Sequence, residues 1–164
     1  ERFSAYKRRS DHEFITSLPN SQRPQWLRPK ARPKKDTLSR IREPSVELSR
    51  MAGITAPRRE IDVAEVYDVT PYHELMACEG LDFCDAGEGA RFTGAGEVAV
   101  NPSGGLLCAN PFFASGLVRI AEAALQVTGR ADDRQVPGAR RAVAHGASGL
   151  AGQAHTVVVL EGEA

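Results

Sequence analysis

The sequence IDVAEVYDVTPYHELMACE, residues 61–79, decides the fold class. Its first part, Ile61–Tyr67, is rich in β-branched residues and predicts a strand. Thr70 and Pro71 then supply a helix N-cap and a proline at the first helical position, which predict a helix continuing toward Gly80. A strand followed directly by a helix is the repeating unit of layered α/β folds.

The alternation continues on both sides of this unit. Ser45 is the predicted N-cap of a short helix that stops at Gly53. Downstream we expect a mobile or tightly turned glycine loop at residues 87–96, the strand Glu97–Val100, a helix from Ser115 to Gly129, and the strands Arg141–His145 and His155–Glu161. The resulting order is helix, strand, helix, strand, helix, strand, strand, and it predicts the α/β class.

Two apolar runs also carry burial predictions. The apolar stripe of residues 115–127 is too broad for an exposed helix, so we expect this helix to lie between a sheet and another layer. The continuous run Val157–Leu160 predicts a strand that is buried on both faces.

Residues 1–44 differ from the rest of the chain in composition. Residues 1–40 hold 11 Lys/Arg and 4 Asp/Glu, a net charge of +7, so the other 124 residues carry a net charge of −7. Prolines recur up to Pro44, and each removes a backbone donor, which predicts an extended arm. We therefore divide the chain into a basic, proline-rich arm at 1–44 and a folded domain at 45–164. No recognition helix accompanies the cationic residues 28–35, so we expect a solvated or partner-contacting arm and no nucleic-acid partner.

The cysteines and the start of the chain exclude several classes. Cys78, Cys84 and Cys108 are odd in number and form no CxxC pair, which argues against disulfide staples and a structural zinc. We expect buried free thiols, no bound metal and a cytoplasmic location. No apolar run follows Glu1, so we expect no signal peptide or membrane anchor, and the missing methionine suggests a chain that begins partway through a longer product.

Three polar or glycine-rich turns follow predicted strands, at residues 67–70, 101–110 and 145–152. Such turns meet at the carboxyl edge of an α/β sheet, where ligands commonly bind. Helix N-termini at Thr70 and Ser115 would add backbone N–H groups suited to an oxyanion or phosphate.

Taken together, these segments resemble the thiolases, and in particular the C-terminal half of the sterol-carrier-protein-x or lipid-transfer type. The resemblance covers about residues 45–164 and rests on motifs in the family's order: residues 61–79, 81–89, Asn101–Gly105, Ala114–Gly116, and residues 134–145. It implies a thiolase-like layered fold of βαβαβαββ type and a protein that handles acyl-coenzyme A thioesters. It also implies a dimer, or an assembly with a thiolase-like or OB-fold subunit.

The resemblance transfers site residues with changes. Thiolases use a cysteine from the other half of the molecule and two motif histidines, and the turns that hold those histidines read Tyr67-Asp68 and Ala109-Asn110-Pro111 here. The resemblance therefore implies Tyr67, Asn110 and His145 as catalytic candidates. It implies Ser103, Gly104, Gly105 and Gly146 as contacts of a coenzyme A thioester substrate, with no covalently bound cofactor.

Two functions remain open. In one, Tyr67 is the acid/base of an acyltransferase or retro-aldolase that makes or breaks a C–C bond, as in lipid or steroid side-chain metabolism. In the other, the chain is a non-catalytic thiolase-like subunit that binds acyl-CoA or a partner protein. The Tyr67 hydroxyl would then only pack at a strand end, and the residues 103–105 would form only a tight turn. Cys108 has no adjacent base and is a weak candidate nucleophile.

Overall fold

The computed structural model describes residues 37–149 and 152–162, and the predicted arm lies outside these residues as far as residue 36. The first described element, helix α2, spans Thr37–Met51 with Pro44 inside it. The predicted helix start at Ser45 is therefore wrong, and the helix crosses the boundary that we placed between residues 44 and 45. Tertiary packing outweighs the lost backbone donor of Pro44, because Ile41 of this helix is 2% exposed.

Four strands form one mixed sheet in the order β2-β1-β3-β4. They are β1 (Val63–Glu65), β2 (Ala99–Val100), β3 (Arg141–Ser148) and β4 (Ala154–Glu161). β1 pairs in parallel with β2 and β3, whereas β3 and β4 form an antiparallel hairpin. The predicted α/β class is confirmed, and the four strands follow one another along the sequence as predicted; the sequence made no prediction of their order in the sheet.

Five further helices are described. α3 (Pro57–Glu60) precedes β1, α4 (Pro71–Gly80) and α5 (Gly89–Ala95) lie between β1 and β2, and α6 (Gly105–Cys108) and α7 (Ser115–Val127) lie between β2 and β3. Short 3-10 turns lie at Phe112–Ala114 and Asp132–Arg134. Helix α4 begins after Thr70 with Pro71 in its first turn, as predicted. The predicted glycine loop is instead α5, whose Phe92 is buried and stacks on Phe83 with 5.8 Å between ring centroids.

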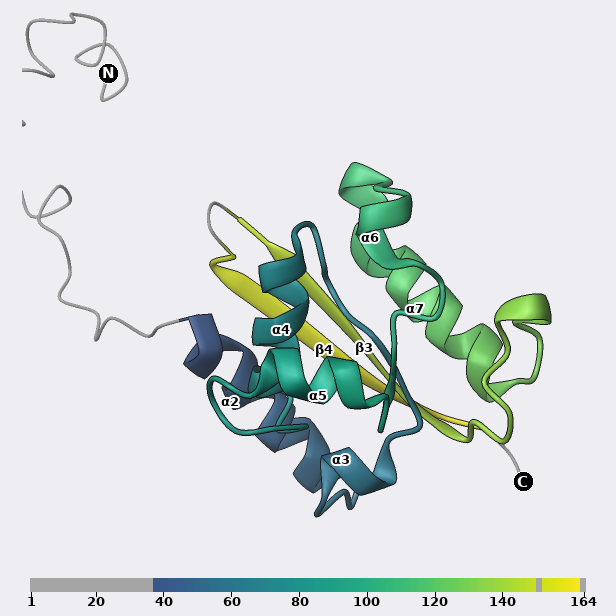
Figure 1. Cartoon of the computed structure of the whole chain (residues 1–164), viewed down its shortest axis with the longest axis horizontal. Helices are drawn as coiled ribbons and strands as arrows, with labels where there is room; N and C mark the ends of the chain where they lie inside the picture. Colours follow the sequence, from purple (N-terminus) through teal and green to yellow (C-terminus); the bar gives the residue numbers. More distant parts are fainter. Residues whose placement is uncertain (1–36, 150–151, 163–164) are drawn as a thin grey trace, which may run out of the picture. The chain divides into compact units, whose positions relative to one another are not determined.

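Helices cover the two faces of the sheet unequally (Figure 1). One face packs against α2, α4 and α5 through a large apolar core. The other face packs against α7 through a smaller cluster that includes Val63, Ala123 and Ala144. The described domain is thus a three-layer arrangement with α7 alone on its side of the sheet.

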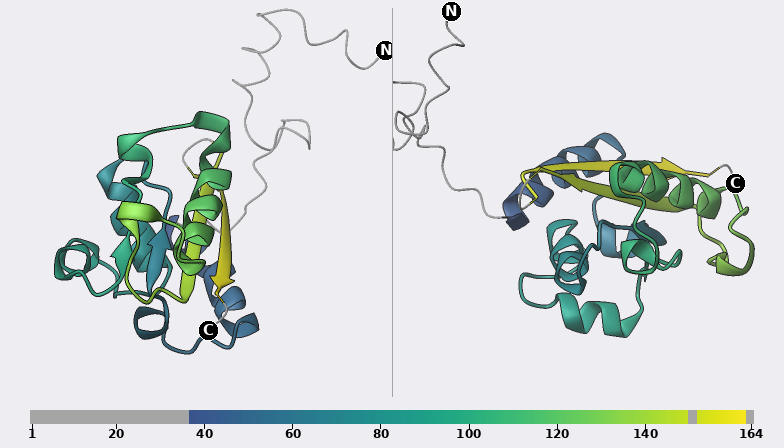
Figure 2. Two further views of the ribbon diagram at one scale, coloured as in Figure 1. Left: turned by 90° about the vertical axis from the view of Figure 1, so that its right-hand side faces the viewer. Right: turned by 90° about the horizontal axis from the view of Figure 1, so that it is seen from above.

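Both burial predictions need correction. Leu117 of α7 is 70% exposed, because no described element covers the outer face of this helix. Strand β4 is an edge strand, visible at the margin of the sheet in Figure 2. Of its run Val157–Leu160, only Val157 is fully buried. The outer face of α7 and the strand β4 carry apolar side chains typical of a protein interior, but the described residues do not cover them completely.

Candidate functional site

A cavity of about 710 Å³ lies at the carboxyl edge of the sheet, between the start of α7, the β3–β4 hairpin and the turn after β1. The described residues that form its walls are mostly small or apolar, and none of them is charged. The lining residues that carry the argument are Tyr67, Asn110, Phe112, Gly116, Gly146 and Thr156. The predicted convergence is confirmed for the turns at residues 67–70 and 145–152. Of the turn at residues 101–110, Asn110 lines the cavity.

Asn110 has a fixed orientation at this cavity. Its Oδ1 accepts a hydrogen bond from the backbone N–H of Phe112 at 2.9 Å. Because that N–H is only a donor, the oxygen must face it, and the Nδ2 amide is left as the donor for a ligand. The same turn holds Phe112 at φ +51°, and the hydroxyl of Ser115 donates to the Phe112 carbonyl. The neighbouring rings of Phe112 and Phe113 are exposed as a result.

Tyr67 enters the cavity from the segment that follows β1. Its backbone N–H donates to Nδ1 of His145 at 3.4 Å, and its ring meets His73 edge-on with centroids 6.0 Å apart. Tyr67 is half-buried, so its position is set by the protein while part of the side chain stays accessible.

His145 does not line the cavity. It alternates along β3 with Ala144 and Gly146, which do line it, so its side chain lies on the opposite face of the sheet. Its exposure is 2%, and burial, with smaller contributions from His155 and His73, lowers the pKa of His145 to about 3. A neutral imidazole behind the strand is not placed to take a proton from a ligand in the cavity.

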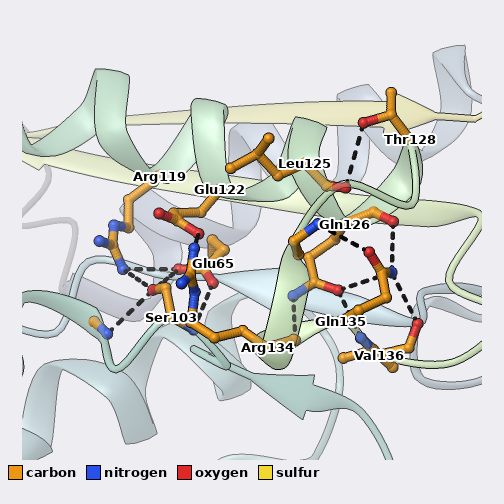
Figure 3. A network of polar contacts seen from close by, with 12 residues as sticks. Glu65, Ser103, Arg119, Glu122, Leu125, Gln126, Thr128, Arg134, Gln135 and Val136 are labelled. Atoms are coloured by element: carbon orange, nitrogen blue, oxygen red, sulfur yellow. Dashed lines mark hydrogen bonds and ion pairs between the residues drawn. The ribbon is translucent and has the colours of Figure 1, made fainter.

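Ser103 is held by a buried ion pair (Figure 3). Its hydroxyl donates to Glu65 at 2.7 Å and its backbone N–H donates to the same carboxylate at 3.2 Å. Arg119 of α7 donates to Glu65 at 2.7 Å and to the Ser103 hydroxyl at 3.0 Å. Burial raises the pKa of Glu65 in spite of these donors. The network ties α7 and the 101–105 turn to β1.

Asp68 is a buried residue that the sequence reasoning missed. It accepts the backbone N–H of Leu106 at 2.6 Å, and a Cβ atom at Gly105 would collide with its carboxylate. Gly105 has φ +64°, so both backbone conformation and space require glycine there. Gly104 packs against Cys108 instead. Ser103, Gly104 and Gly105 lie outside the cavity, and their contact with coenzyme A stays a prediction.

The loop after α7 is fixed by two glutamines, also seen in Figure 3. Gln126, which is 1% exposed, donates to the Arg134 carbonyl and accepts the Val136 N–H. Gln135 donates back to the Gln126 carbonyl at 2.9 Å. These hydrogen bonds hold residues 134–136 of the loop that leads to β3 against the end of α7.

Metal and thiol chemistry find little support in the described part of the chain. No cluster of three or more His, Cys, Asp or Glu side chains there is arranged to hold a metal ion. Cys78 is buried, and burial raises the pKa of its thiol to about 12. Cys108 is exposed, contrary to the expectation of buried thiols, and none of the three cysteines lines the cavity. Among the same described residues, no helix has the length and apolarity needed to cross a bilayer.

Comparison with known proteins identifies the family. The model of the family described as "Thiolase C-terminal domain-like" matches residues 30–161. Human sterol carrier protein 2 is 40% identical over 101 residues, which cover 57% of this chain and 18% of the human protein. An acetyl-CoA acetyltransferase of Methanothermobacter thermautotrophicus is 38% identical over 102 residues, covering 58% of this chain and 27% of that enzyme. A non-specific lipid-transfer protein-like 2 of Caenorhabditis elegans is 31% identical over 104 residues, covering 57% and 25%.

The chain therefore aligns with only about a fifth to a quarter of the length of these relatives. The family model, by contrast, matches most of the chain, including every strand of the sheet. The mixed α/β fold is consistent with this match, which shows that the chain belongs to the thiolase C-terminal domain-like family.

Proposed function

We propose that the cavity beside Tyr67 binds the acyl-thioester portion of an acyl-coenzyme A. The observation that carries this proposal is that Tyr67 and Asn110 line one cavity without charged walls. The resemblance to the thiolases implies that these are the two positions at which this chain replaces the motif histidines. Both residues can donate hydrogen bonds without carrying charge, which suits a neutral carbonyl group.

The thioester oxygen would accept the Nδ2 amide of Asn110, which is oriented by Phe112. Helix α7 begins at the same cavity with Ser115 and Gly116, and its positive end favours negative charge on that oxygen. The acyl chain would lie along Ile120, Ala144 and Val158. The phosphates of coenzyme A would stay outside, because none of the described residues that line the cavity is cationic.

The reaction that these groups suit is retro-aldol cleavage of a β-hydroxyacyl thioester. The β-hydroxyl proton passes to the Tyr67 oxygen, which releases its own phenolic proton toward the α-carbon, as the bond between the α- and β-carbons breaks and the β-carbon becomes a carbonyl. The electron pair moves into the thioester enolate, whose oxygen accepts a hydrogen bond from Asn110. The phenolic proton of Tyr67 completes the new C–H bond at the α-carbon, so Tyr67 ends the reaction with one proton, as it began. Acyl transfer through a cysteine would need a sulfur from another part of the protein, since no described cysteine lines the cavity.

A second candidate function is binding of acyl-CoA without turnover. The position of His145 on the opposite face of the sheet favours this function. Among the described residues that line the cavity, Tyr67 is then the one titratable side chain, so no second acid or base accompanies it. Under this function the cavity presents or protects an acyl group for a reaction elsewhere in a larger protein.

We also propose that a second thiolase-like half covers the open face of α7, within the same protein or from a dimer or hetero-oligomer partner. The exposed Leu117, Phe112 and Phe113 support this, as does the much greater length of the relatives. An OB-fold subunit is the other partner that the resemblance implies. The free thiols support a reducing compartment, and we propose the cytoplasm.

The two functions separate in one assay of the purified chain. The protein is mixed with a β-hydroxyacyl-CoA, and separately with an acyl-CoA plus acetyl-CoA, and the products are followed by mass spectrometry. Cleavage of the first substrate that is lost in Tyr67→Phe but kept in Tyr72→Phe supports the aldolase, because Tyr72 is exposed on α4 outside the cavity. Binding of both acyl-CoAs without turnover supports the passive subunit. Absence of binding contradicts both.

A further inference from the structure

A row of hydrogen bonds joins four groups on the face of the sheet opposite the cavity. The Tyr67 N–H points to Nδ1 of His145 at 3.4 Å, Nε2 of His145 lies 3.0 Å from Nδ1 of His155, and Nε2 of His155 lies 2.9 Å from the Gly152 carbonyl. The two imidazole rings are stacked with centroids 5.3 Å apart.

The groups at the two ends of this row of hydrogen bonds determine which ring nitrogens carry a proton. A backbone N–H is only a donor, so Nδ1 of His145 carries no proton and Nε2 does. That Nε2–H donates to Nδ1 of His155, which leaves the His155 proton on Nε2, facing the Gly152 carbonyl. All three hydrogen bonds therefore run in one direction, with both rings neutral and in the Nε2–H tautomer.

A second proton on either imidazole ring would face a hydrogen-bond donor and would have no acceptor. On Nδ1 of His145 it would face the Tyr67 N–H, and on Nδ1 of His155 it would face the His145 Nε2–H. Among described residues, the other groups that act on the pair are His73 of α4 and Arg40 of α2, which also donates to the Gln153 carbonyl. Both make a further positive charge less favourable. Burial is the largest cause that lowers the pKa of His155, although its bond to Gly152 acts in the opposite sense.

This row of hydrogen bonds links three parts of the cavity wall. Tyr67 lies at the end of the β1 segment, His145 on β3, and Gly152 in the turn between β3 and β4. Gly146, Gly149 and Ala154, which line the cavity, belong to the same hairpin. A broken link therefore frees the Tyr67 backbone or the hairpin turn, on either side of the ligand.

We propose that His145 and His155 are positioning residues that form a proton-sensitive latch, which holds Tyr67 and the hairpin wall in place only while both rings are neutral. This deepens the proposed function and rests on it for the ligand, because acid then weakens acyl-thioester binding. Below the pKa of the first ring to protonate, affinity falls about tenfold per pH unit if only the neutral pair binds.

The first test needs no ligand. The sequence has four histidines, so long-range ¹H–¹⁵N spectra of ¹⁵N-histidine-labelled protein can be assigned with single His→Gln variants. At pH 7.5 we expect both rings of the pair as Nε2–H tautomers, and on acidification a joint change together with faster amide exchange at Gly149 and Gly152. A Nδ1–H tautomer in either ring, or two independent titrations near 6.5, would overturn the latch.

The second test uses acyl-CoA affinity measured by calorimetry from pH 7.5 to pH 3.5, a range that extends toward the lowered pKa values of both rings. His155→Gln keeps an acceptor for His145 and a donor for Gly152 but does not titrate, so it should flatten the pH dependence. His73→Gln is the control for a histidine outside these hydrogen bonds. It should keep the slope of the pH dependence, although the loss of its ring contact with Tyr67 lowers the affinity at every pH. The same ligand serves all three proteins, so its own protonation cancels. An unchanged slope in His155→Gln overturns the latch. Absence of binding at every pH overturns the proposed function instead of the latch. In that case, and also if His155→Gln does not fold, the tautomer test alone decides whether the latch exists.

Discussion

The guanidinium of Arg119 lies 2.7 Å from a carboxylate oxygen of Glu65, and the two side chains are 3% and 0% exposed. The pair joins α7 to β1, and the hydroxyl of Ser103 bridges both partners. Nε of Arg119 has no hydrogen-bond partner among the described residues, so the pair is not fully satisfied. It fixes the geometry of α7 against the sheet rather than adding much net stability.

Removing one partner should be far costlier than removing both. Arg119→Met leaves a buried carboxylate without its cation, and we expect the free energy of unfolding to fall by about 3–5 kcal/mol. Glu65→Gln combined with Arg119→Met should recover most of that loss in urea denaturation. The exposed pair Arg50–Glu47 is the control, since solvent screens this pair and Arg50→Met should change the free energy of unfolding little. Equal losses at the two sites would refute this account of the buried pair.

Gly80 marks a close approach between α4 and α2. A Cβ atom there would lie 2.6 Å from Cβ of Ile41, so Gly80→Ala should destabilise the domain by about 1–3 kcal/mol through overpacking. Gly94→Ala is the matched control, because Gly94 faces open space inside α5 and alanine favours helix by about 0.5–1 kcal/mol. Thermal unfolding of the two variants should shift in opposite directions, and a shift in the same direction would contradict the packing of α2 on α4.

Gly146 should control the width of the cavity. A Cβ atom there would lie 3.5 Å from Cα of Gly116, which is an ordinary contact, so Gly146→Ala should fold with unchanged or slightly higher stability. The added methyl group projects between β3 and α7, and we expect acyl-CoA affinity to drop about tenfold, or about 1.4 kcal/mol. Calorimetry measures the affinity, with Gly94→Ala again as control. Tight binding by Gly146→Ala would place the ligand elsewhere.

Acid should destabilise the domain through His145. In the unfolded chain this imidazole takes up a proton near its ordinary pKa of 6.5, while the folded protein holds the pKa near 3. Stability from this group is therefore complete above about pH 6.5 and is lost as pH falls toward 3, with a slope of at most about 1.4 kcal/mol per pH unit. His145→Gln should show a shallower loss in urea titrations at pH 7, 6, 5 and 4. An equally steep loss in that variant would assign the effect to other groups.

Local signals predicted much of the fold. Thr70-Pro71 correctly opened α4, and the β-branched residues of 61–67 contained β1. The failures come from tertiary contacts that no local pattern encodes. Pro44 lies inside α2 because Ile41 is buried against α4, and glycines did not prevent α5 because Phe92 enters the core.

The candidate site was predicted in part. Tyr67, Asn110 and Gly146 meet at one cavity because turns after neighbouring strands share an edge. His145 was grouped with them, although the strand alternation between Ala144 and Gly146 already indicated the opposite face. Asp68 and Glu65 were missed because the sequence does not reveal that a carboxylate is buried until its partners are placed.

The most direct test of the central claim is a ligand titration followed by NMR. ¹⁵N-labelled protein is titrated with an acyl-CoA and, in parallel, with free coenzyme A, and shifts of backbone and Asn side-chain amides are mapped. We predict that the acyl-CoA alone perturbs Gly116, Gly146, Gly149 and the Asn110 side-chain amide. Perturbations confined to residues 127–129 and 138–140, which line a separate hollow at the other end of the β3–β4 hairpin, would contradict the account.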